Sequence, residues 1–146
     1  QFQDADNNTC SLLTRQELIS LSIPKGTLTE EERNTMERHV ELTKKMLEKL
    51  PFTKELSQAP VYACMHHETL DGKGYPYGLN ENQIPIEARI LAISDVFDAL
   101  TASDRPYKNG MDVNKAIEIM RNMSGKRKLD NDLLELFIEG KVWEKT

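Results

Sequence analysis

The segment 66-HHETLDGKGYP-76 concentrates the side chains of this sequence that are best suited to chemistry. Two of the chain's three histidines, His66 and His67, stand next to each other in it. Neutral imidazole is a common metal ligand, but neighbouring residues on a regular helix point about 100° apart. Both imidazoles can face one point only if the helix ends at the pair, and the glycine-rich turn that follows supplies such an end.

A metal centre needs further ligands, and two other predicted helices offer them. His39 lies at the edge of an apolar stripe in one helix, and Asp95 lies in a helix that is apolar on most sides. An ionised carboxylate in apolar surroundings is costly unless a metal, a cation or hydrogen-bond donors compensate it. An exposed strip of the helix, or a capping role, is the alternative for Asp95, and the pattern alone leaves both interpretations open.

The types of ligand restrict the metal. Imidazole nitrogen with carboxylate oxygen suits iron, manganese, zinc or nickel better than calcium. The zinc-protease motif HExxH is excluded, because Asp71 stands where its second histidine would be. Glu68 and Asp71 are predicted to orient the imidazoles, since ligating histidines usually donate their other nitrogen to an acceptor. For Asp71 a turn-forming role in Asp-Gly is equally compatible with the sequence.

Three further residues could contact a ligand. Tyr75, before Pro76, offers a pocket wall on which a base could stack, although packing within the loop is the simpler explanation. Arg105 and Lys108 follow the Asp95 helix, where they could clamp a phosphate. Their spacing alone favours a solvated helix end.

Helical periodicity dominates the rest of the chain and predicts an all-α fold. A stripe of Met36, Val40, Thr43, Leu47 and Leu50 predicts the core-facing side of one helix. A capping box at 29-TEEE-32 marks its start. The predicted helices cover about residues 14–21, 29–50, 60–66, 85–102, a stretch from 112, and 130–140. Residues 1–13 are polar, without periodicity, and are interpreted as a tail or linker.

Composition excludes several classes of protein. With 146 residues the chain suits one domain, and its net charge of −5 argues against binding to a nucleic acid polymer. The apolar stretches are too short, or too interrupted by acids, to insert in a membrane. Cys10 and Cys64 are far apart in the sequence and form no CxxC pair. With no signal peptide visible, this favours a cytoplasmic protein.

HHETLDGKGYP resembles the HHExxDGxGYP signature of the HD-GYP domains. The similarity extends from about residue 24 to 108. It implies an HD-domain-like helical bundle that hydrolyses cyclic di-GMP at a two- or three-metal site rich in iron or manganese. By this resemblance Gly74, Tyr75 and Pro76 form the loop that closes one side of the pocket, and Arg105 and Lys108 hold the phosphates. The resemblance assigns the metal ligands as His39, His66, His67 and Asp95.

The sequence departs from the family in one respect: the His-Asp doublet is absent, as are the upstream ligand and the lysine that follows the doublet. Either residues 14–146 are the C-terminal part of a domain in a longer protein, or the chain is a degenerate member. The first explanation is favoured. It predicts a bundle incomplete at its N-terminus, an incomplete metal site, and a fragment that is inactive alone.

Several partners and alternatives follow from this interpretation. A cyclic dinucleotide is the expected ligand, and a sensory or regulatory domain is expected in the longer protein. Exposed apolar surface left by missing helices makes a homodimer plausible. A non-catalytic module that binds a cyclic dinucleotide or a partner protein is the main alternative function, and a phosphohydrolase for another nucleotide is a third.

Overall fold

A computed structural model describes residues 2–3, 9–10, 12–22, 29–102 and 110–144 of the chain. These residues form six α-helices, which confirms the all-α prediction. The chain divides into two units, residues 1–39 and 40–146, and each is described by itself. No helix in the described residues is long and apolar enough to cross a membrane.

The first unit begins with a short strand pair. Strands β1 (Phe2–Gln3) and β2 (Thr9–Cys10) pair in antiparallel fashion within the segment interpreted as a polar tail. Helix α1 (Arg15–Leu21) follows, and Thr14 caps it. The Thr14 hydroxyl accepts the Glu17 N–H at 3.2 Å, and the Glu17 carboxylate accepts the Thr14 N–H at 2.7 Å. This reciprocal pair is a capping box, and it explains why so short a helix begins at that residue.

Helix α2 (Glu30–Leu47) begins where the sequence predicts. The Thr29 hydroxyl accepts the Glu32 N–H at 3.2 Å, and the Glu32 carboxylate accepts the Thr29 N–H at 2.8 Å. The predicted stripe is right only in its middle: Val40 is buried, whereas Met36 and Leu50 are exposed. An apolar stripe shows which side of a helix is able to pack, but not along how much of its length a partner is present.

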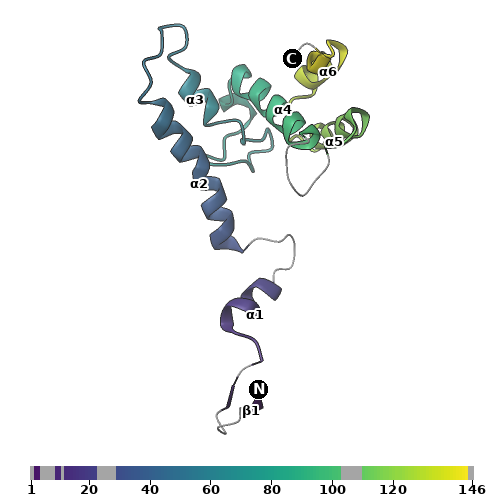
Figure 1. The fold of residues 1–146 in the computed structure, drawn as a ribbon. Coiled ribbons are helices and arrows are strands. Elements are labelled where there is room, and N and C mark those ends of the chain that lie inside the picture. Colours follow the sequence, from purple (N-terminus) through teal and green to yellow (C-terminus); the bar gives the residue numbers. More distant parts are fainter. Residues whose placement is uncertain (1, 4–8, 11, 23–28, 103–109, 145–146) are drawn as a thin grey trace. The chain divides into compact units, whose positions relative to one another are not determined.

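The second unit centres on helix α4 (Ile86–Thr101). Helix α3 (Ala59–Ala63) packs on one side of α4, and helices α5 (Val113–Gly125) and α6 (Asn131–Glu139) pack on the other (Figure 1). Two short 3-10 helices, η1 (Glu81–Gln83) and η2 (Val142–Glu144), complete the unit.

The core lies where α4, α5 and α6 meet. Met120 and Leu134 are fully buried there, and the rings of Phe97, Phe137 and Trp143 pack beside them with centroids 5.2 to 5.6 Å apart. The buried members of the cluster are Ala92, Ile93, Met120, Leu129 and Leu134.

Helix α4 is less buried than its sequence predicts. One face, with Ala88, Ala92 and Ile93, is buried, but Ile86 and Ile90 are exposed. The prediction of a helix buried on most sides is therefore wrong for this chain. The physical reason is that α5 and α6 cover one side, while α3 is only five residues long and covers little of the other.

Arg89 ties three elements together. Its guanidinium donates to Asp130 Oδ2 at 2.9 Å, to the Ile84 carbonyl at 2.9 Å and to the Glu81 carbonyl at 2.5 Å. Burial raises the pKa of Asp130, but the Arg89 bond and the N–H groups of the α6 N-terminus outweigh it and hold that pKa below its ordinary value. Asp130 therefore caps α6 as a carboxylate and anchors it to α4.

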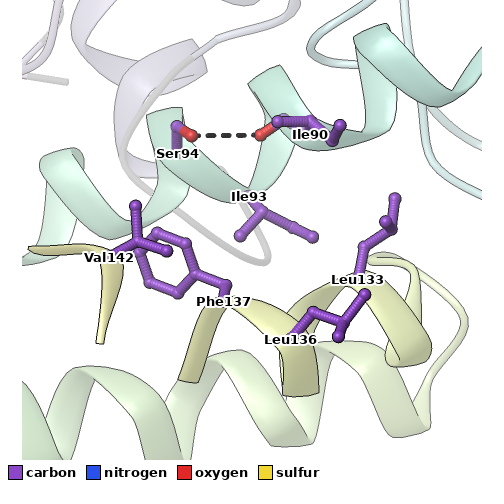
Figure 2. Close-up of a pocket in the computed structure, with 7 residues that line it drawn as sticks. All are labelled: Ile90, Ile93, Ser94, Leu133, Leu136, Phe137 and Val142. Atoms are coloured by element: carbon purple, nitrogen blue, oxygen red, sulfur yellow. Dashed lines mark hydrogen bonds between the residues drawn. The ribbon is translucent and has the colours of Figure 1, made fainter. Parts of the chain in front are cut away.

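A second feature of the unit is an apolar hollow of about 270 Å³ between α4 and α6 (Figure 2). Ser94 supplies the only hydroxyl of its lining, and this hydroxyl donates to the Ile90 carbonyl at 3.1 Å. The hollow therefore presents mainly hydrocarbon. Its lining consists of Ile90, Ile93, Ser94, Leu133, Leu136, Phe137 and Val142.

Candidate metal centre

The histidine pair lies just beyond the end of α3. The helix ends at Ala63, and the chain then turns through His66 and His67. The two ring centroids are 3.9 Å apart at an interplanar angle of 44°. Because the helix has already ended, the two side chains do not have to point about 100° apart as neighbours on a regular helix do. The glycine-rich turn after the pair predicts such a helix end.

Hydrogen bonds set the tautomer of two imidazoles. His66 Nδ1 lies 2.6 Å from the Ala63 carbonyl, and His39 Nδ1 contacts the Met36 carbonyl. A carbonyl oxygen only accepts, so Nδ1 carries the proton in both residues. In this tautomer the lone pair is on Nε2. Nε2 is therefore the nitrogen that can bind a metal while Nδ1 donates to the carbonyl.

One nitrogen from each of His39, His66 and His67 lies within 4.8 Å of the nitrogens of the other two. His39 is exposed and precedes the buried Val40 on α2, whereas His66 and His67 are half-buried. Three imidazoles at this separation could hold one transition metal ion, and their nitrogen donors fit the metals that the sequence favours.

Asp95 lies near the histidine pair but is not buried. Its side chain is 47% exposed, and its Oδ2 is 4.0 Å from His67 Nδ1. The expectation of a carboxylate in apolar surroundings is therefore wrong, and the alternative of an exposed strip on the helix is what the structure has. The exposed carboxylate of Asp95 needs no metal to compensate its charge. Asp95 remains a candidate ligand because it lies beside His67.

His66 and Asp95 line the same hollow, of about 400 Å³, between α3 and α4. Asp98 lines it as well, and the sequence interpretation missed this residue. Its spacing of three from Asp95 would have indicated it, because residues three apart share a helix face. The hollow is lined by Thr43, Ala63, His66, Leu91, Ser94, Asp95 and Asp98.

The two acids of the motif bond within the loop that follows it. Glu68 is buried, and its two oxygens accept the N–H groups of Tyr77 and Leu79 at 2.7 and 2.8 Å. Asp71 accepts from the Thr69 hydroxyl at 2.5 Å and from the Lys73 N–H at 3.1 Å. The Thr69 bond is the main reason that the pKa of Asp71 is lowered. These bonds favour a role in shaping the loop over the predicted role of orienting an imidazole.

Tyr75 lies against the metal-binding candidates. Its ring centroid is 4.7 Å from that of His67, at 30°. Gly74 allows this approach, because a Cβ there would lie 2.4 Å from Glu68 Cα. Pro76 follows Tyr75 through a cis peptide bond. The predicted phosphate-binding residues, Arg105 and Lys108, lie outside the described residues.

The sequence profile of the HD domain family matches residues 14–133. The chain is 36% identical to the cyclic di-GMP phosphodiesterase response regulator RpfG of Xanthomonas campestris pv. campestris (strain 8004), over 84% of this chain and 32% of RpfG. It is 42% identical to the cyclic di-GMP phosphodiesterase PA4108 of Pseudomonas aeruginosa, over 68% of this chain and 23% of that protein.

A third relative acts on a different dinucleotide by its name. The chain is 42% identical to the 3'3'-cGAMP-specific phosphodiesterase 3 of Vibrio cholerae serotype O1, over 65% of this chain and 20% of that protein. The chain thus spans about a third or less of the length of these relatives.

Proposed function

Starting from the fact that this chain belongs to the HD domain family, we propose that it is the C-terminal part of a metal-dependent phosphodiesterase domain that acts on a cyclic dinucleotide. The observation that carries the proposal is the convergence of three imidazoles beside a hollow that Asp95 and Asp98 also line. Relatives named as phosphodiesterases of cyclic di-GMP and of 3'3'-cGAMP support the substrate class.

Iron or manganese is the proposed metal, held by His39, His66 and His67 with Asp95 as a carboxylate donor. Imidazole nitrogen with carboxylate oxygen is a ligand set of these metals. A bound divalent ion supplies Lewis acidity toward a phosphodiester. The chain's own residues hold the ion through Nε2 of His39 and His66, while the carbonyls of Met36 and Ala63 fix the ring orientations.

For the substrate, cyclic di-GMP is our first choice and 3'3'-cGAMP the second. Tyr75 is proposed to wall one side of the pocket, where its ring offers a face on which a base stacks. Arg105 and Lys108 are proposed to hold the phosphates. Local cations are needed for such a ligand, because the net charge of the chain is −5 and would otherwise repel it.

The 146 residues contain no His-Asp doublet. We therefore propose that hydrolysis requires a longer protein, in which a preceding segment supplies the doublet and a sensory or regulatory domain is attached. By itself the chain is proposed to bind at most about one metal ion and to be inactive.

The missing doublet also favours a second candidate, a non-catalytic module that binds a cyclic dinucleotide or a partner protein. Where the second candidate binds a cyclic dinucleotide, the two candidates share the ligand and differ only in hydrolysis. Only the first requires that a longer protein with a His-Asp pair upstream cleaves the dinucleotide.

The test compares the full-length protein with this chain, each loaded anaerobically with iron or manganese, on cyclic di-GMP and on 3'3'-cGAMP. We expect cleavage by the full-length protein, loss of cleavage in its His66→Ala variant, and none by the chain alone. Binding without cleavage in the full-length protein would select the second candidate. Neither binding nor cleavage of either dinucleotide would refute the first candidate and would leave only a module that binds a partner protein.

A further inference from the structure

Glu68 is a buried carboxylic residue whose side chain bonds to a distant part of the chain. It is 4% exposed, and its two oxygens bond to amides nine and eleven residues further on, those of Tyr77 and Leu79. A carboxylate loses its hydration when it is buried, so donors must compensate it, and bonds to an ionised acceptor are the stronger kind. The loop amides therefore compensate the burial of the Glu68 side chain, and that side chain in turn stabilises one shape of the loop.

The same loop is attached to the histidine segment at further points. The Tyr75 N–H donates to the His67 carbonyl at 3.3 Å. Gly74 packs so closely on the backbone that a Cβ would lie 2.4 Å from Glu68 Cα and from the Thr69 nitrogen. A bridge between Asp71 and Asn80 closes the ends of the loop. We refer to residues 71–80 as the 71–80 loop.

We propose that Glu68 is a positioning residue that holds the 71–80 loop in the shape that sets the Tyr75 ring against the His67 imidazole. The ring centroids are 4.7 Å apart, and the loop contacts above leave Tyr75 little freedom to move away. A wall that is already in place spares a ligand the entropy of ordering it. The consequence for ligand affinity rests on the proposed function, whereas the consequence for loop order does not.

Glutamine is the informative replacement. Glu68→Gln keeps the size of the side chain but offers a single acceptor oxygen, and its NH₂ group faces one of the two loop N–H donors. One of the two N–H groups then loses its carboxylate acceptor, and we expect this loss to change the local opening equilibrium by about tenfold.

The experiment follows the 146-residue chain by nuclear magnetic resonance. We expect the amides of Tyr77 and Leu79 to exchange about tenfold faster in Glu68→Gln than in the unmodified chain. The ring protons of His67 should also lose the shift that the Tyr75 ring current imposes. The exchange of Met120, in the core of α5, should not change. Glu118→Gln, an exposed change of the same charge on α5, is the control and should leave all of these signals alone.

Measured affinities for the ligand and for the metal distinguish a positioning role of Glu68 from a merely structural one. In Glu68→Gln the affinity for cyclic di-GMP should fall about tenfold, while the affinity for Mn²⁺ alone stays within about threefold. An equal loss of Mn²⁺ affinity would assign Glu68 to orienting an imidazole and overturn the proposal. Unchanged exchange at Tyr77 and Leu79 would overturn it as well.

A second variant reaches the same loop without touching the carboxylate. Gly74→Ala places a methyl group on the backbone of Glu68 and Thr69, so it should displace Tyr75 and abolish the ring-current shift on His67. It carries the test if Glu68→Gln does not fold. If the unmodified chain binds no cyclic dinucleotide but the two amides still depend on Glu68, the loop role stands and the proposed function alone fails.

Discussion

The two sides of helix α4 differ in what they face, although both are hollowed. Toward α6 the hollow of Figure 2 is lined by hydrocarbon, and its one hydroxyl, on Ser94, is bonded to the helix itself. Toward α3 the hollow contains His66, Asp95 and Asp98. Ser94 lines both hollows, so they adjoin the same helix at this residue.

One side of α4 contributes to stability, and the other carries the side chains suited to chemistry. The side that faces α5 and α6 contains Ala92 and Ile93, which join the buried cluster, so packing there holds the unit together. The side that faces α3 exposes Leu91, Asp95 and Asp98. Hydrated carboxylates beside imidazoles cost little to fold and are available to a ligand. Substitutions on the two sides should therefore have different consequences.

The largest effect on stability is expected in the core below the apolar hollow. Leu134 is fully buried, so Leu134→Ala should lower the free energy of unfolding by about 2–5 kcal/mol. Leu136, also on α6, lines the hollow but is 63% exposed, and Leu136→Ala should stay within about 0.5 kcal/mol. Urea unfolding of both variants measures the difference, and equal losses would show that the hollow is part of the core.

A smaller effect, dependent on pH, is expected for Arg89→Met. Losing the partly buried pair with Asp130 should cost about 1–3 kcal/mol at pH 7. The folded pKa of Asp130 lies below its ordinary value, so its stabilisation is complete above about pH 4 and is lost as pH falls through the folded pKa. The difference between the variant and the unmodified chain should thus shrink in acid.

A matched control for this pair exists on the surface. Arg121 pairs with Glu135 at 2.9 Å, but the two side chains are 56% and 38% exposed. Arg121→Met should destabilise the chain clearly less than Arg89→Met at pH 7, because solvent screens an exposed pair. A loss equal to that of Arg89→Met would remove the distinction between the two pairs.

A small effect on stability and the largest effect on ligand binding should coincide at the histidine pair. His66→Ala combined with His67→Ala should change the free energy of unfolding by less than about 1 kcal/mol, because these half-buried side chains contribute little to the core. Calorimetric Mn²⁺ binding should disappear.

The unmodified chain should bind at most about one Mn²⁺ per monomer, since three imidazoles replace a full ligand set. Asn122→Ala, exposed on α5, serves as the control and should change neither property. Two tightly bound ions per chain, or loss of cooperative unfolding in the histidine variant, would contradict the assignment.

Local signals predicted the helices well. The capping box at Thr29, which the sequence predicts, depends on side chains and amides only three residues apart, so it can be identified without knowing the fold. The box at Thr14 and the caps at Asp112 and Asp130 are equally local, although only the starts of these helices were predicted. The end of α3 before the histidine pair is of the same kind.

The predictions failed where they depended on the surroundings of a helix. For Asp95 the sequence left a buried and an exposed position open, because apolar composition does not reveal which side of a helix another helix covers. Met36, Leu50 and Ile90 are exposed for the same reason. The bonds from Glu68 to Tyr77 and Leu79 carry no signal in the sequence, because any backbone amide can serve as donor.

The sequence by itself determined the helical class, the helix starts and the motif that identifies the family, since each depends on residues close together along the chain. Only the tertiary structure decided which side of α4 is buried, that imidazoles from two segments converge, and that Glu68 bonds to the loop. These depend on contacts between residues distant in sequence, whose partners are chosen by the packing of whole helices and by the path of the backbone between them.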